Sequence, residues 1–261
     1  MLRLLALLAV LVAACRPAPG LDLTRYELVD LSHSYSAATL YWPTSPSAFE
    51  LKPIHVGPTP AGFFYSAYTF ATPEHGGTHL DAPVHFDAKG ISVERIPLDR
   101  LVGPAVVLDV SAKAAADPDY RLTLADIEAF EADHGSIAPG TIVLLRTGWS
   151  ARWGDRKAYF GDDTPNDATK LHFPGYGVEG RLLVEERQVA ALGVDSPSVD
   201  YGPSQDFPVH RLGAPRGVPN FENLTGLERV PPRGATLFAL PMKIEGGSGA
   251  PLRAVALVPA R

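Results

Sequence analysis

Apolar and β-branched residues gather along the chain in short runs, which turn-forming residues separate from one another. Runs of this length and composition are typical of β-strands. They predict six strands, at Tyr26–Leu31, Phe63–Ala71, Ala105–Val110, Thr141–Arg146, Thr236–Ile244 and Arg253–Val258.

Two other segments carry apolar residues at helical spacing. Thr123 is placed to cap the first helix, with Asp126 three residues further on, and Gly135 is placed to end it. The second helix is predicted within residues 178–192, where Leu182 and Val189 can share one face. Strands outnumber helices, so the pattern predicts a single mixed α+β domain.

Long stretches without periodicity lie between these elements. The 25 prolines and 24 glycines imply many turns. Residues 40–60 are rich in proline, and residues 152–180 are rich in Asp, Gly and aromatic residues, so we predict a loop in each. Loops this long in a compact domain usually cover a site or reach a neighbouring subunit.

The start of the chain has the pattern of an export signal. An apolar stretch from Leu4 to Val12 follows Met1-Leu-Arg and ends at Ala13-Ala14-Cys15. This stretch is too short to remain as a membrane-spanning helix. Val12-Ala-Ala-Cys15 resembles a bacterial lipobox, which predicts a lipidated Cys15. We therefore expect a signal peptide over residues 1–14, a tether over residues 15–24, and a domain over residues 25–261.

These features predict a lipoprotein held at the periplasmic side of the cell envelope, where acyl chains would anchor it to the membrane. An ordinary secretory leader is the alternative. Cys15 is the only cysteine, so thiolate metal sites are excluded from the domain. The net charge of -6 arises without a basic stripe, so nucleic acid is not an expected partner.

The segment that carries chemistry is His75-Gly-Gly-Thr-His79-Leu-Asp81-Ala-Pro-Val-His85. In an extended chain, alternation would place all four polar side chains on one side. If His75 to His79 formed a helical turn, the two histidines would share a face, and Asp81 would reach the same point. Both geometries predict one focus for these residues.

Imidazole and carboxylate ligands suit zinc, manganese or iron, and three protein ligands leave a position for water. Such an ion can lower the pKa of water to about 7 and polarise a carbonyl group. The other interpretation of the segment is a turn whose histidines only pack or bond to the backbone. We predict one divalent ion, Mn or Zn, bound by His75, His79 and Asp81.

The same segment, followed by Phe86, resembles the signature of the cyclase family, which includes bacterial kynurenine formamidases and isatin hydrolases. The likeness extends over most of the domain, at residues 30–33, 145–149, 194–200 and 239–243. The resemblance implies a swivelling β/β/α-type fold with long functional loops. It also implies a homodimer or tetramer in which a loop from one subunit completes its neighbour's pocket.

Site roles follow from the resemblance residue by residue. His75, His79 and Asp81 match metal ligands, and His85 matches a catalytic or outer histidine. In the formamidase branch a second zinc is bridged by the motif aspartate and completed by a later His and Glu, which match His210 and Glu222 here. The alternative is that His210 and Glu222 bind the attacking water and move its proton in a one-metal site.

Residues 194–210 and 39–44 resemble the isatin hydrolase branch more than the formamidase branch. Aromatic residues in and near these segments could form flat walls for an aromatic amide substrate, although core packing explains any one of them equally well. The candidates for the substrate pocket are Trp42, Phe63, Phe64 and Tyr201.

We therefore expect a metal-dependent amidohydrolase that opens a small cyclic amide. The alternative within the family is an arylformamidase that acts on N-formylkynurenine. The alternative of another class is a lipoprotein that binds a metal or an aromatic ligand without turnover.

Overall fold

The computed structural model describes residues 22–260, so the predicted signal peptide and the lipidated Cys15 lie outside the described residues. The first element among the described residues is a 3-10 turn at Leu23–Arg25, inside the end of the predicted tether. Among the described residues no helix has the length and apolar character needed to cross a bilayer.

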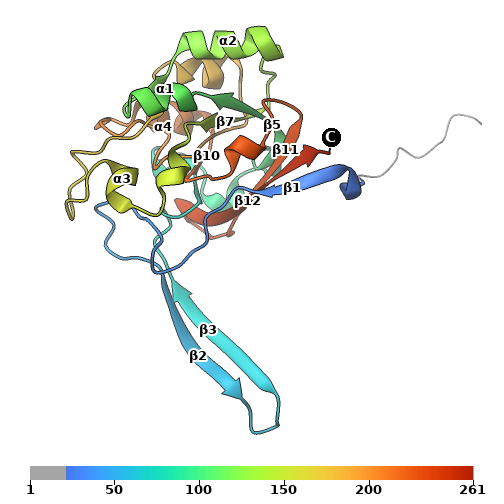
Figure 1. The fold of residues 1–261 in the computed structure, drawn as a ribbon, viewed down its shortest axis with the longest axis vertical. Helices are drawn as coiled ribbons and strands as arrows, with labels where there is room; N and C mark the ends of the chain where they lie inside the picture. Colours follow the sequence, from blue (N-terminus) through green and yellow to red (C-terminus); the bar gives the residue numbers. More distant parts are fainter. Residues whose placement is uncertain (1–21, 261) are drawn as a thin grey trace, which may run out of the picture.

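Twelve strands and four α-helices make up the described chain (Figure 1). The strands are β1 Tyr26–Asp30, β2 Glu50–Pro58, β3 Phe64–Ala71, β4 His79–Asp81, β5 Val102–Asp109, β6 Arg121–Leu122, β7 Ile142–Arg146, β8 Gly175–Tyr176, β9 Ala191–Val194, β10 Asn220–Glu222, β11 Ala235–Pro241 and β12 Gly249–Pro259. The helices are α1 Ser111–Ala116, α2 Leu124–His134, α3 Arg156–Phe160 and α4 Pro208–Gly213.

The main sheet is mixed and closes on itself. Its strands follow the order β1-β12-β11-β5-β7-β9-β10-β4, and β12 also pairs with β4. This extra pairing joins seven strands into a barrel-like ring, while β1 adds to the outer part of β12. The expected mixed α and β single domain is thus confirmed.

Strands β5 and β7 lie between the two larger of the three buried apolar clusters in the described residues. Ala105 and Val107 of β5 face one apolar cluster inside the ring, and Val106 and Leu108 face a second cluster. Ile127 of α2 packs into the second cluster, so the helix covers the outside of these parallel strands. Strands buried on both faces are apolar throughout, which is the pattern observed here.

The helix predicted after Thr123 is confirmed as α2. The Thr123 side chain accepts a hydrogen bond from the backbone N–H of Asp126, and Asp126 Oδ2 accepts from the backbone N–H of Thr123 at 2.8 Å. This reciprocal arrangement is a capping box. Gly135 ends the helix with φ of 83°.

The second predicted helix is wrong for most of its length. Residues 178–192 are helical only over residues 180–186, with a π-helical turn at Leu182–Glu186, and β9 begins at Ala191. Gln188 lies between them with φ of 51°, which ends helical geometry. Because β9 is buried on both faces, its apolar run shows no alternation that would distinguish a strand from a helix.

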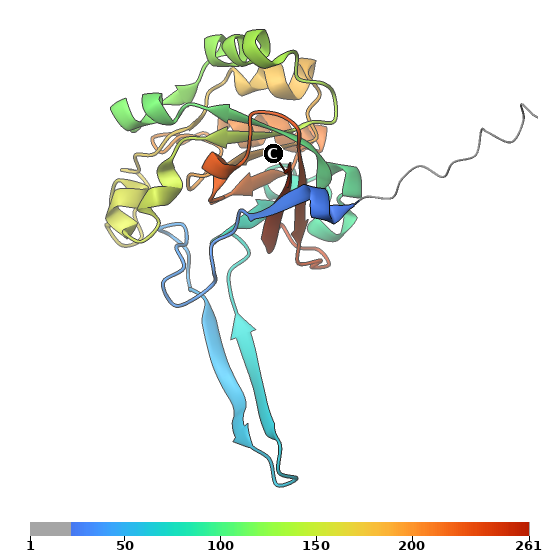
Figure 2. The same cartoon turned by 45° about the vertical axis from the view of Figure 1, so that its right-hand side comes forward.

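The predicted loop over residues 40–60 is half strand. Strand β2 pairs with β3 in a long antiparallel hairpin that extends away from the barrel (Figure 2). The register shifts between Pro53 and His55. Prolines are tolerated in a strand that has a free edge, and this hid β2 from the sequence pattern. The predicted loop over residues 152–180 contains only α3 and β8.

Candidate metal centre

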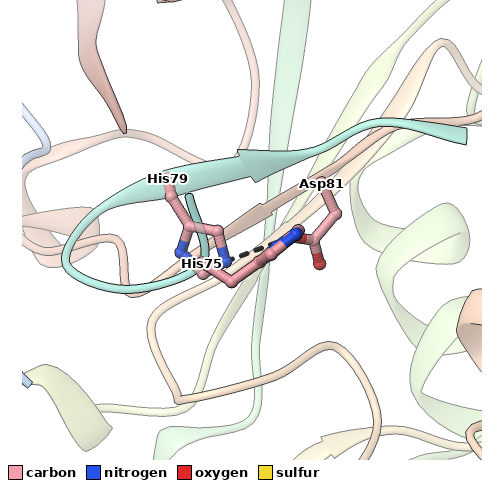
Figure 3. A group of neighbouring side chains, drawn as sticks. All are labelled: His75, His79 and Asp81. Atoms are coloured by element: carbon pink, nitrogen blue, oxygen red, sulfur yellow. Dashed lines mark hydrogen bonds and ion pairs between the residues drawn. The ribbon is translucent and has the colours of Figure 1, made fainter. Parts of the chain in front are cut away.

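Strand β4 places the central part of the histidine motif. It lies between β10 and β12, with His79 opposite Glu222 on one side and Pro251 on the other. Alternation along the strand puts His79 and Asp81 on the same face. His75 precedes the strand and turns back toward them across Gly77, which has φ of +59° (Figure 3).

Two groups of candidate ligands meet at Asp81. In the first group, Asp81 Oδ1 lies 2.6 Å from His75 Nδ1 and 3.1 Å from His79 Nε2. In the second, Asp81 Oδ2 lies 3.0 Å from His210 Nε2, which is 3.3 Å from Glu222 Oε1. The structure therefore brings together all five residues predicted to serve a one-ion or a two-ion site.

Each of these three histidines has its outward ring nitrogen bonded to another group. His75 Nε2 lies 3.0 Å from Ser248 Oγ, His79 Nδ1 lies 3.0 Å from the Gly77 carbonyl oxygen, and His210 Nδ1 lies 2.6 Å from Asp200 Oδ2. Carbonyl and carboxylate oxygens accept, so in the neutral rings of His79 and His210 the other nitrogen carries the lone pair. That arrangement fits a cation held between the rings.

The charges in the centre depend strongly on one another. Burial opposes the charge of Asp81, but His75 and His79 hold the pKa of its carboxyl group well below the usual range. Burial likewise opposes the charge of His210, but hydrogen bonds to Asp200 and Asp81 raise its pKa well above the usual value. Protons on the imidazoles balance the buried acids, and a divalent cation could replace them.

His85 differs from the other three histidines. It lies at the end of the 3-10 turn Pro83–His85, and its ring makes no hydrogen bond to another described residue. Its ring stacks on His75 and lies edge-on to His210, with centroids 6.2 Å apart. Burial lowers the pKa of His85 to about 4. A neutral imidazole with free ring nitrogens beside the ligands can accept a proton from water.

A cavity of about 270 Å³ opens over the ligands. The cluster of histidines and acids forms one wall. Aromatic and aliphatic side chains form the other, and they surround a space suited to a flat ring. No lysine or arginine of the described chain lines this cavity. The apolar wall consists of Leu40, Tyr41, Trp42, Phe86, Phe160, Pro197 and Phe207.

Of the four predicted pocket residues, only Trp42 lines the cavity of its own chain. Phe63 and Phe64 lie at the turn of the β2–β3 hairpin with 59% and 68% of their surface exposed, because the hairpin carries them away from the barrel. Tyr201 lies outside the lining, where Arg121 stacks over its ring at 4.9 Å. In a single chain these three residues therefore lie outside the cavity.

The named pocket candidates left out four aromatic residues of the wall, Tyr41, Phe86, Phe160 and Phe207, although Tyr41 and Phe207 lie in the segments 39–44 and 194–210 that were predicted to form flat walls. Phe86 directly follows the histidine motif, and Phe207 precedes the Pro-Val-His210 segment, so their positions next to ligands were a usable signal. Phe160 comes from α3, inside the long predicted loop, and no local pattern connects it with the site.

Comparisons with known proteins agree with this geometry. The Cyclase family model matches residues 29–201. The isatin hydrolase of Roseibium aggregatum is 35% identical over 206 residues, which cover 76% of this chain and 77% of that protein. The kynurenine formamidase of Salinibacter ruber is 32% identical over 230 residues, which cover 87% of this chain and 96% of that protein.

Solved structures show the same similarity. Isatin hydrolase A from Ralstonia solanacearum superimposes with a TM-score of 0.81 at 36% identity, covering 90% of this chain and 93% of that one. An isatin hydrolase bound to the product analogue thioisatinate gives a TM-score of 0.82 at 32% identity, covering 90% and 94%. The family match and the relatives together show that this chain belongs to the cyclase family.

Proposed function

We propose that the protein is a metal-dependent hydrolase that opens the ring of a small cyclic aryl amide, as isatin hydrolase does. The observation that carries the proposal is the cavity itself, in which a buried ligand cluster faces an aromatic wall. The ligand cluster suits an ion that activates water, and the aromatic wall suits a flat ring whose carbonyl group must lie beside that ion.

His75, His79 and Asp81 would hold the ion. Two imidazoles and a carboxylate suit Mn or Zn, and we propose one of these as the resident ion. When bound, such an ion supplies Lewis acidity to a carbonyl group and lowers the pKa of water. His85 would accept the proton of the attacking water and return it to the leaving nitrogen.

The second ligand group allows two roles for His210 and Glu222. Asp81 Oδ2 faces them while Asp81 Oδ1 faces the first group, so the aspartate could bridge two ions. In a one-ion site, His210 and Glu222 would instead hold the attacking water by hydrogen bonds. Metal content at saturation distinguishes one ion from two.

The charge of the lining favours a neutral substrate. N-formylkynurenine carries a carboxylate on its amino acid end, and burying that group without a cationic partner is costly. The described cavity offers no lysine or arginine to pair with it. Isatin carries no such charge. An arylformamidase activity remains the second candidate, since kynurenine formamidases are also relatives and the two-ion ligand set is present.

The experiment that tests the function compares kcat/KM for isatin and for N-formylkynurenine, with the protein loaded with Mn or with Zn. We expect turnover of isatin at a higher kcat/KM than N-formylkynurenine, loss of turnover after chelation, and recovery when the ion is restored. Failure to hydrolyse any cyclic amide, aryl formamide or lactone in a panel would leave only a binding role.

We propose further that the protein works as an assembly of identical subunits. Both faces of the β2–β3 hairpin are largely exposed and carry apolar side chains such as Ile54, Phe63 and Phe64. An isolated two-stranded hairpin is marginally stable in water, so a covering partner would stabilise it. The family resemblance supports a second copy in a homodimer or tetramer as that partner.

The remaining parts of the proposal rest on the sequence. The lipobox-like segment supports an exported lipoprotein, anchored through Cys15 at the periplasmic side of a membrane, after removal of residues 1–14. Residues 15–24 would be the tether, and residues 25–261 the hydrolase domain. For that domain, the ring of mixed strands with α2 outside it supports the swivelling β/β/α description that the resemblance implies.

A further inference from the structure

Ser248 reaches the metal centre from the other end of the chain. It lies directly before β12, while its hydroxyl oxygen lies 3.0 Å from Nε2 of His75. Two backbone hydrogen bonds connect Ser248 to the segment that contains the histidine motif. The Ser248 N–H donates to the Glu74 carboxylate, and the Ser248 carbonyl oxygen accepts from the Ala82 N–H at 2.8 Å.

Glu74 settles the direction of the hydrogen bonds. Ser248 Oγ lies 2.6 Å from Glu74 Oε2, and a carboxylate oxygen can only accept. The single hydroxyl proton of Ser248 is therefore used toward Glu74, and its oxygen lone pairs remain for His75. It follows that His75 Nε2 carries a proton and donates it to Ser248.

The consequence falls on the other ring nitrogen. In a neutral His75 with its proton on Nε2, the lone pair must lie on Nδ1, the atom 2.6 Å from Asp81 Oδ1. The ring has little freedom to turn away, since it stacks on His85 and a Cβ at Gly249 would come within 2.5 Å of its Cε1. His75 would thus be preset as an Nδ1 ligand.

We propose that Ser248 and Glu74 are positioning residues for the metal centre, which hold His75 in the Nε2-protonated form and so raise its affinity for a divalent cation. The inference rests on the metal-dependent function proposed above and extends it to two residues outside the ligand set. Outer partners of this kind typically change metal affinity by about 10- to 100-fold.

The loop that precedes β12 has a second anchoring contact, which offers a matched control. Ser92 Oγ donates to Glu94 Oε1 at 2.8 Å, and Glu94 Oε2 accepts from the backbone N–H of Gly246 at 3.1 Å. This second Ser–Glu pair therefore holds the loop before β12 in a similar way to Glu74 and Ser248, but neither side chain bonds to a histidine. Variants of the two pairs separate loop anchoring from an effect on His75.

The experiment measures the Kd for Mn and for Zn on full-length protein by chelator competition. Ser248→Ala and Glu74→Gln are expected to weaken binding, by about 10- to 100-fold for Ser248→Ala. Ser248→Thr, which keeps the hydroxyl group, should restore most of the affinity. Ser92→Ala and Glu94→Gln should leave Kd unchanged.

A second readout is the ring tautomer, followed by ¹⁵N NMR of histidine-labelled, zinc-loaded protein. His75 should carry its proton on Nε2. Any one of three results would overturn this inference while leaving the proposed function in place. These are equal Kd values for Ser248→Ala and the wild type, an equal loss of affinity in Ser92→Ala, and a proton on Nδ1 of His75. A wild-type protein that binds neither ion would overturn the proposed function with it.

Discussion

His85 stacks on His75 with ring centroids 3.8 Å apart and planes 20° from parallel. The two rings touch but have different environments. His75 is bonded at both ring nitrogens, to Asp81 and to Ser248, whereas the His85 ring makes no hydrogen bond to another described residue. The environment of His75 therefore suits a metal ligand, whereas that of His85 suits a group that exchanges protons with water.

Replacing His85 with Phe should therefore remove proton transfer while keeping a ring stacked on His75. We expect kcat to fall by about 10²- to 10⁴-fold, the usual contribution of a general base, with Kd for the metal nearly unchanged. Stopped-flow or steady-state kinetics with isatin, beside a metal titration, would check this. Full activity in His85→Phe would exclude the residue as the proton acceptor.

Asp200 fixes His210 from outside the centre. Its carboxylate accepts from the backbone N–H groups of Val209 and His210 and from the His210 ring. Asp200→Asn should lower kcat by about 10²-fold or more, because the amide cannot hold the ring in the same protonation state. Asp206→Asn, a change in the neighbouring turn, serves as the control and should keep wild-type kinetics.

The cavity wall predicts different effects for two residues that the sequence had grouped together. Trp42 meets Phe160 and Phe173 edge-on and lines the cavity, so Trp42→Ala should raise KM for isatin by about tenfold. Tyr201→Ala should leave KM unchanged, since Tyr201 lies outside the lining. A large KM effect at Tyr201 alone would contradict the cavity described here.

His33 predicts part of the response to acid. Its ring stacks on Trp153 at 4.0 Å, its Nε2 is buried without a hydrogen-bond partner, and burial lowers its pKa to about 4. Between pH 6.5 and 4 the unfolded chain binds the extra proton, so the free energy of unfolding falls as pH falls through this window.

The variant His33→Phe keeps the stack and removes the titration. On going from pH 7 to pH 5 it should lose about 1 kcal/mol less stability than the wild type, a figure reduced for the partial exposure of the ring. Urea unfolding at both pH values measures the difference. Burial raises the pKa of Asp195 to about 6, so protonation of this residue raises the free energy of unfolding as pH falls. Asp195 is present in the wild type and in His33→Phe alike, so its contribution cancels in the comparison. Parallel curves for the two proteins would contradict the prediction.

The hairpin predicts the state of assembly. Changing both Phe63 and Phe64 to Ser should weaken self-association and shift the protein toward monomer in analytical ultracentrifugation, because apolar burial drives such contacts. Leu98→Ser with Val178→Ser is a matched control, as these side chains are 69% and 63% exposed elsewhere on the surface. Equal dissociation in both double variants would argue against the hairpin as the contact.

Much of this site could be predicted because its central residues lie within one short segment. His75, His79 and Asp81 meet through a turn at Gly77 and the alternation of β4, both of which are local features. Of the two geometries considered for the segment, alternation is right in part and the helical turn is wrong. Alternation holds from His79 to Asp81, whereas His75 arrives by a glycine turn and not by a helix.

What escaped prediction depends on contacts between distant segments. Ser248 contacts His75 although 173 positions separate them in the sequence, and no local sequence pattern at either residue predicts this contact. The hairpin escaped because prolines weaken the strand pattern of β2. Phe63 and Phe64 were predicted to line the substrate pocket, and only the fold reveals that the hairpin carries them away from the cavity of their own chain.

Strand β12 has a consequence for when the protein can become active. It closes the ring by pairing with β4, and the residues immediately at its start bond to or pack against His75. During synthesis the ribosome releases the histidine motif long before this strand. A nascent chain would therefore expose the ligands with neither their final geometry nor the partner that selects the ring tautomer. Firm capture of the ion would have to wait until β12 has been made and inserted.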